Sequence, residues 1–193
     1  GNHMSFRADA EREVRATLAD YGFVRSRSGP DFIEFRNRKV LLGFWLDRGD
    51  ELYATLGTIR PKRLFSSRQR FNFTDILDLI DHPDHAWFSG LMLPSSEAMT
   101  RGLARLVSTI NEVAYPYLVG DRQAYAKVER FVDEKREKWI TDMELETMRQ
   151  RLRDAWSAKD FGSVVETLLP HRKHLTPSEM AKLEYSQKHL ETG

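Results

Sequence analysis

Cysteine is absent from the 193-residue chain, and its absence excludes disulfides, thiolate metal sites and cysteine nucleophiles. Long hydrophobic runs are also absent, because no stretch approaches the roughly 18 apolar residues of a membrane span. No secretory signal pattern follows the first residues, so we expect a soluble, cytoplasmic protein. The net charge is only +1, which excludes the overall basic surface of a general DNA-binding protein.

Catalytic motifs are missing too. The sequence contains no phosphate-binding loop, no glycine-rich dinucleotide fingerprint and no nucleophile elbow. Acidic pairs do occur, but Asp47 and Asp50 flank a predicted turn. Asp75 and Asp78 lie in the first turn of a predicted helix, where negative charge complements the helix dipole. We therefore predict no catalytic residue, no cofactor and no enzymatic activity.

The first part of the chain has the pattern of a helix followed by a sheet. Residues 1–4 have the composition of a tag remnant, and we assign them no role. Apolar residues then recur every four positions, at Phe6, Ala10, Val14 and Leu18. Between residues 23 and 60 the period changes to two, which predicts three or four antiparallel strands. The preceding helix can pack on one face of that sheet.

The second half of the chain has a helical pattern. Apolar residues between Met99 and Tyr117 are spaced alternately by four and three, as on the buried side of a helix. Capping boxes at Thr141–Glu144 and Thr176–Glu179 predict two further helix starts, and Asp160 predicts a third. The predicted α+β fold has three parts: a helix on a small antiparallel sheet over residues 5–81, a connecting loop over 82–94, and an all-helical region over 95–190 that packs on the first part.

A cationic segment follows the predicted strands. Five cations stand there among phenylalanines, and no acidic residue occurs from Leu52 to Phe73. Arginine pairs well with carboxylates, and aromatic rings anchor protein contacts, so the segment suits an acidic protein surface. It also suits nucleic-acid phosphates and bases, or it is a solvated loop beside an edge strand. The predicted partner-binding residues are Arg60, Lys62, Arg63, Phe65, Arg68, Arg70 and Phe71.

Two histidine pairs are weak candidates for metal ligands. His82 and His85 are three residues apart beside acidic residues, and His171 and His174 have the same spacing. Zinc or iron uses such ligands together with carboxylates. No His-Glu-x-x-His pattern supports the site, and polar loop residues explain the pairs equally well. We therefore predict no metal site, and a histidine–carboxylate metal-dependent hydrolase remains an alternative.

Several segments of the N-terminal part form a family-like pattern. They are Tyr21-Gly22-Phe23, Phe32–Phe35, the strand Val40–Leu46, Glu51-Leu52-Tyr53 and the short helix Phe73–Leu77. Over roughly residues 6–80 this pattern resembles a group of uncharacterised bacterial proteins, some of which resemble immunity proteins of polymorphic toxin systems. The resemblance implies a protein that binds a cognate toxin without catalysis, and it carries over no functional residue.

The C-terminal stretch shows a second likeness. Ala155-Trp156, Asp160-Phe161, Val164-Val165 and Leu183–Tyr185 resemble one helical hairpin of the tetratricopeptide kind. A solenoid needs about three stacked repeats, and only one unit is present, so we predict a packing hairpin and not a peptide-binding groove. Taken together, the sequence predicts a non-catalytic, cytoplasmic, immunity-like protein that binds a protein partner. A nucleic-acid-binding accessory protein that uses residues 60–70 remains an alternative.

Overall fold

The computed structural model describes residues 3–59 and 70–193, and the chain divides into two compact units. The units are Gly1–Val132 and Asp133–Gly193, so the division falls inside one long helix, α6 (Arg122–Ser157). The sequence placed the division at residues 82–94. That segment belongs to the first unit because it carries a strand that pairs with the sheet, and the amide of Leu93 donates to the carbonyl of Asp50 at 2.9 Å.

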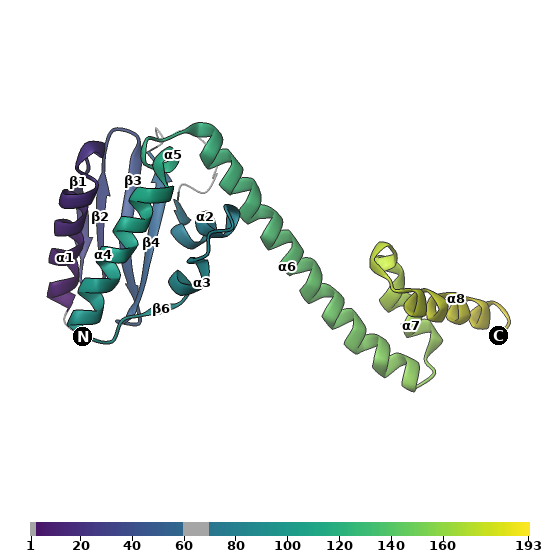
Figure 1. Ribbon diagram of the computed structural model, residues 1–193. Helices are drawn as coiled ribbons and strands as arrows, with labels where there is room; N and C mark the ends of the chain where they lie inside the picture. Colours follow the sequence, from purple (N-terminus) through teal and green to yellow (C-terminus); the bar gives the residue numbers. More distant parts are fainter. Residues whose placement is uncertain (1–2, 60–69) are drawn as a thin grey trace. The chain divides into compact units, whose positions relative to one another are not determined.

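The first unit is built on one antiparallel sheet (Figure 1). Four strands follow one another with short turns, as the alternating pattern predicted. Two short strands that the pattern did not reveal pair with the fourth strand. The strands are β1 (Val24–Gly29), β2 (Phe32–Arg36), β3 (Val40–Asp47), β4 (Glu51–Thr58), β5 (Arg70–Asn72) and β6 (Leu91–Met92). Their order is β1-β2-β3-β4-β5, with β6 also on β4.

Helices α1 (His3–Thr17) and α4 (Ser96–Val113) lie side by side on one face of this sheet (Figure 1). The predicted stripe of α1 is buried, and it shares a single core with α4 and the inward residues of the sheet. Such burial contributes about 1.5–3 kcal/mol for each large apolar side chain. Gly22 follows the 3-10 turn η1 (Ala19–Tyr21) with a φ of 70°, a left-handed conformation that glycine adopts without strain. The expected helix on an antiparallel sheet is confirmed.

Three short helices complete the first unit. They are α2 (Phe73–Leu79), α3 (His85–Phe88) and α5 (Tyr115–Leu118). Helix α2 packs beside β4 and β5, and its residues Ile76 and Leu77 are fully buried. The predicted loop 82–94 therefore contains both α3 and β6, each too short to produce a periodic pattern.

The second unit consists of the C-terminal part of α6 and the elements that follow it. They are α7 (Phe161–Leu168), the 3-10 turn η2 (Leu169–His174) and α8 (Pro177–Glu191). Its own core contains Leu145, Met148, Leu152, Val164, Leu168 and Leu183. Within residues 3–59 and 70–193, every helix is too short or too polar to cross a bilayer.

Of the three helix starts predicted at Thr141, Asp160 and Thr176, two are confirmed and one is wrong. Thr176 forms the full capping box with Glu179, and the side chain of Asp160 accepts from the amide of Ser163, so both starts are confirmed. The start predicted at Thr141–Glu144 is wrong, because α6 runs through it without interruption. A capping box needs a non-helical residue at its first position, and the charged helix formers before Thr141 continue the helix instead.

Candidate binding groove

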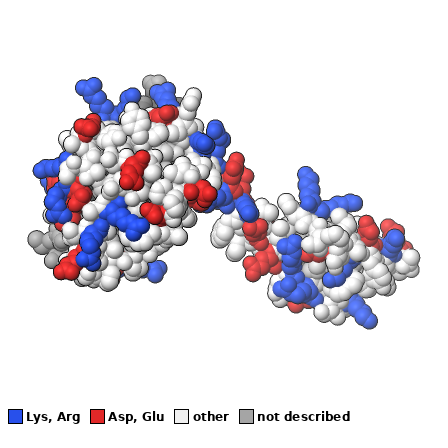
Figure 2. Space-filling model, in the orientation of Figure 1, with Lys and Arg blue, Asp and Glu red and all other residues white. Residues whose placement is uncertain are grey.

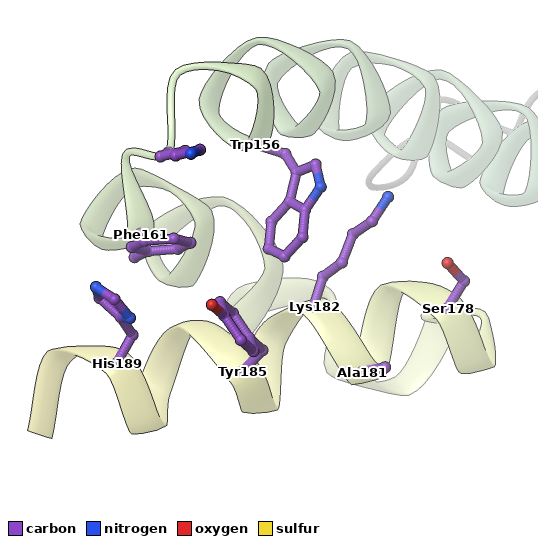
Figure 3. A pocket seen from close by; sticks show the side chains of 8 residues that line it. Trp156, Phe161, Ser178, Ala181, Lys182, Tyr185 and His189 are labelled. Atoms are coloured by element: carbon purple, nitrogen blue, oxygen red, sulfur yellow. The ribbon is translucent and has the colours of Figure 1, made fainter. Parts of the chain in front are cut away.

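An open groove in the second unit is lined by side chains from three helices (Figure 3). It has a volume of about 790 Å³. Pockets of this size accommodate a small molecule or a few side chains of a partner. The residues that line it are Trp156, Lys159, Phe161, Ser178, Ala181, Lys182, Tyr185 and His189.

Four rings lie next to one another in this groove, and we call Trp156, Phe161, Tyr185 and His189 the ring cluster. The Tyr185 ring has its centroid 5.8 Å from that of Trp156 and 5.6 Å from that of Phe161, both edge to face. The His189 ring lies 4.3 Å from the Phe161 ring. These distances are those of favourable aromatic pairs. Tyr185 nevertheless keeps 54% of its surface exposed, so the cluster is open to solvent.

The end of α6 sets the first wall of the groove. The amide of Asp160 donates to the carbonyl of Ala155 at 2.9 Å, and the amide of Lys159 donates to that of Trp156 at 3.1 Å. This is the Schellman pattern that ends a helix, with Lys159 in the left-handed position at a φ of 53°. Asp160 then caps α7, which places Phe161 at the first position of that helix, facing the groove (Figure 3).

The start of α8 sets the second wall. The guanidinium of Arg149 on α6 donates two hydrogen bonds to the Glu179 carboxylate, at 2.9 and 3.3 Å. Glu179 also accepts from the amide of Thr176. The Arg149 guanidinium lowers the pKa of Glu179 below its ordinary value of 4.5, so the carboxylate stays charged. The partly buried ion pair fixes α8 against α6. Successive turns of α8 then point Lys182, Tyr185 and His189 into the groove (Figure 3).

The groove is cationic as well as aromatic. Its eight lining residues include two lysines and no acidic residue. The ammonium of Lys182 lies 5.5 Å from the centre of the Trp156 ring, within the range of a cation–π contact. In the described part of the chain, neither Lys182 nor Lys159 has an acidic partner. The groove therefore presents rings and unneutralised ammonium groups together.

Most of the predicted partner-binding residues lie outside the described residues. They are Arg60, Lys62, Arg63, Phe65 and Arg68. The other two are described, and the structure corrects the role of Phe71. Phe71 pairs with Leu56 across β5 and β4, is only 4% exposed and belongs to the core. An anchor must be accessible before the partner binds, so Phe71 is not available for that role.

Arg70 is held by a contact within the sheet. Its guanidinium lies 2.6 Å from a carboxylate oxygen of Glu34, which also pairs with Arg27 at 3.1 Å. Glu34 is 2% exposed, so the two arginines neutralise a buried charge on the outer face of the sheet. The Arg70 guanidinium also lies 5.9 Å from the Trp45 ring. Arg70 therefore has a structural role in the sheet, and its predicted contact with a partner stays a prediction.

The histidine candidates do not converge on a metal site. The ring nitrogen Nδ1 of His82 accepts from the amide of Asp84 at 3.0 Å, and His85 lies near the hydroxyl of Ser89. In residues 3–59 and 70–193, no three His, Asp or Glu side chains are grouped as metal ligands. The described residues therefore support neither histidine pair as a metal centre.

The sequence analysis found part of the groove but interpreted it differently. Trp156, Phe161 and Tyr185 stood out as a helical hairpin pattern, and Trp156 does pack against the core of the second unit. The open groove was missed, because three helices are needed to form it. The spacing of Lys182, Tyr185 and His189 along one face of α8 was the available signal. Comparisons of the chain with protein-family models, with curated proteins and with solved structures gave no match.

Proposed function

We propose that this chain is a non-catalytic, cytoplasmic binding protein that holds a protein partner in the groove of its second unit. The observation that carries this proposal is the open ring cluster. Aromatic side chains in well-shaped depressions dominate the binding energy of protein interfaces. The exposed face of Tyr185 and the half-buried rings of Trp156 and Phe161 beside it provide such an anchor site.

The resemblance of residues 6–80 to immunity-like proteins suggests which kind of partner the chain binds. An immunity-like protein would bind a toxin and block it, and it needs a contact surface but no catalytic group. The cationic segment at residues 60–70 is a second contact surface in this proposal. It stays a prediction from sequence, because only Arg70 of its cations is described.

The test compares two tyrosines of similar exposure. Tyr185 in the groove is 54% exposed, and Tyr115 in the first unit is 61% exposed. The wild-type chain, Tyr185→Ala and Tyr115→Ala are used to capture proteins from a lysate of the bacterial host. We expect a partner that the wild type and Tyr115→Ala retain and that Tyr185→Ala loses. Calorimetry with the purified partner then gives the stoichiometry and the affinity of each variant.

Two outcomes contradict the proposal. If all three proteins retain the same partner with equal affinity, the partner binds elsewhere and the groove is not its site. If the purified partner is instead chemically altered by the wild-type chain, the protein is an enzyme. Near-ultraviolet circular dichroism of Tyr185→Ala provides the folding control, because loss of the native aromatic signal would explain lost binding by unfolding.

A further inference from the structure

We propose that the groove binds an acidic peptide segment of its partner, in which carboxylates flank an aromatic or large aliphatic side chain. This inference rests on the proposed function and specifies the chemistry of the partner. It follows from three features of the groove: its uncompensated lysines, the strained backbone that carries one of them, and the arrangement of its rings.

Charge complementarity is the first feature. Lys182 is half-buried against Trp156, and Lys159 stands at the opposite wall. Neither forms an ion pair with an acidic side chain in the described part of the chain, and the residues that line the groove include no carboxylate. The Lys182 ammonium faces the Trp156 ring at 5.5 Å and has no carboxylate partner among the described residues. A carboxylate of the ligand would supply the missing partner, so the groove selects acidic segments over neutral ones.

The backbone at Lys159 is the second feature. The left-handed position that ends a helix is usually glycine, because other residues suffer a clash of about 1–2 kcal/mol there. Lys159 occupies it at a φ of 53°. Its side chain forms no ion pair in the described residues, so no such interaction within the chain offsets this strain. The backbone of Lys159 ends α6, and its exposed side chain is left to line the groove.

The rings provide the third feature. Tyr185 meets Trp156 and Phe161 edge to face, so ring faces and edges both remain open along the groove (Figure 3). An aromatic side chain of the ligand can add to such a cluster in the same geometry, and an aliphatic one can cover the ring faces. Because the lysines lie beside the rings, the carboxylates of the ligand must be close in sequence to its apolar anchor.

A nucleic acid would also offer stackable bases and negative charge, but the second unit does not suit it. Residues 133–193 contain eleven Lys and Arg against twelve Asp and Glu, a net charge of −1. Figure 2 shows the two signs interspersed on the visible face, without a continuous basic path. Nucleic-acid binding requires several phosphates to be neutralised at once, and the groove offers two lysines. A peptide with two or three carboxylates matches it better.

The experiment selects short random peptides displayed on phage against the immobilised full chain, with prior depletion on Tyr185→Ala. We expect enriched sequences to place Asp or Glu within a few residues of an aromatic or large aliphatic residue. One such peptide, made with a fluorescent label, is then titrated with the variants. Lys182→Gln should weaken binding about two- to five-fold, and Tyr185→Ala about 30-fold. Lys188→Gln, an exposed lysine on the same helix outside the groove lining, should leave the affinity unchanged.

The peptide itself provides the second arm. Replacing its Asp and Glu by Asn and Gln should weaken binding to the wild type and make no further difference with Lys159→Gln/Lys182→Gln. The inference is overturned if no sequence is enriched, if the enriched peptides are neutral or basic, or if Lys182→Gln and Lys188→Gln behave alike. It is also overturned if oligothymidylate displaces the peptide, because the groove would then be a nucleic-acid site. A captured partner that depends on Tyr185 but binds without acidic residues would leave the proposed function standing and remove only this inference.

Discussion

Removing Arg70 separates its structural role from a role in partner binding. The buried Glu34 carboxylate accepts charged hydrogen bonds from Arg27 and approaches Arg70 at 2.6 Å. A hydrogen bond to a charged group contributes about 1.5–3 kcal/mol. Arg70 is 37% exposed and Arg27 stays in place, so water and Arg27 recover part of this loss. We therefore expect Arg70→Met to lower the free energy of unfolding of the first unit by about 1–2 kcal/mol.

The assay follows urea unfolding by NMR at the indole proton of Trp45. This indole donates to the hydroxyl of Thr55 at 3.0 Å on the same face of the sheet, so its resonance reports on the first unit alone. Methionine keeps a long apolar stem near the Trp45 ring, which limits the change to the lost charge. Arg36→Met, an exposed arginine on the same sheet face, is the matched control and should change the stability by less than about 0.5 kcal/mol.

A double-mutant cycle with Glu34→Gln completes the test. If Arg70 acts through Glu34, the double variant loses less stability than the sum of the two single losses, by about 1 kcal/mol. Strict additivity would refute the coupling. An Arg70→Met protein of wild-type stability that no longer binds the partner would show that Arg70 acts in the interface, as the sequence first indicated.

Four further predictions concern single groups. Lys159→Gly should raise the stability of the second unit by up to about 1 kcal/mol in urea unfolding, because it relieves the left-handed strain. Ser186→Ala should raise it by about 1 kcal/mol, since the buried hydroxyl has no hydrogen-bond partner in the described residues. Tyr125→Phe should lower the stability of the first unit by about 1 kcal/mol, because the buried phenol donates to the main-chain carbonyl of Tyr117 at 2.8 Å. Burial raises the pKa of Tyr125, so the phenol stays protonated and keeps this hydrogen bond. The last prediction concerns pH. Arg149 lowers the pKa of Glu179, so the charged Glu179 carboxylate stabilises the folded state. This stabilisation is complete above the ordinary pKa of 4.5, and it is lost as the pH falls through the lowered folded-state pKa. Thermal unfolding of Glu179→Gln should therefore vary less than that of the wild type between neutral and acidic pH.

The elements that the sequence predicted correctly are those with long regular patterns or local caps. The stripe of α1, the four long strands and the caps at Asp160 and Thr176 depend on neighbours in sequence. The strands β5 and β6 are three and two residues long, too short for an alternation to be recognised. Phe71 was misassigned for this reason, since its burial depends on pairing with Leu56 across the sheet.

The candidate site was harder to predict than the fold, because it depends on tertiary placement. The cationic segment is conspicuous in sequence because its residues are consecutive. The groove takes its residues from three helices, and Lys159 differs from any other exposed lysine only through its backbone conformation. No sequence pattern marks a left-handed lysine, since the usual signal at that position is glycine. The sequence could predict the hairpin but not which of its faces stays open.

The chain has two aromatic surfaces, the outer face of the sheet and the groove, and they differ in whether their polar and charged groups have partners within the chain. On the outer face of the sheet, Phe32 stacks on Trp45 with centroids 4.9 Å apart, and the indole of Trp45 has its hydrogen-bond acceptor. The charge of Glu34 beside them is neutralised by two arginines. In the groove, by contrast, Tyr185 is largely exposed, Lys182 lacks a counter-ion among the described residues, and Lys159 is strained. Local rules that are broken without compensation inside the fold are typical of sites that serve a ligand. Substitutions that remove backbone strain in the groove, such as Lys159→Gly, should therefore stabilise the chain and weaken its binding of the partner. Substitutions on the outer face of the sheet should mainly lower the stability of the fold.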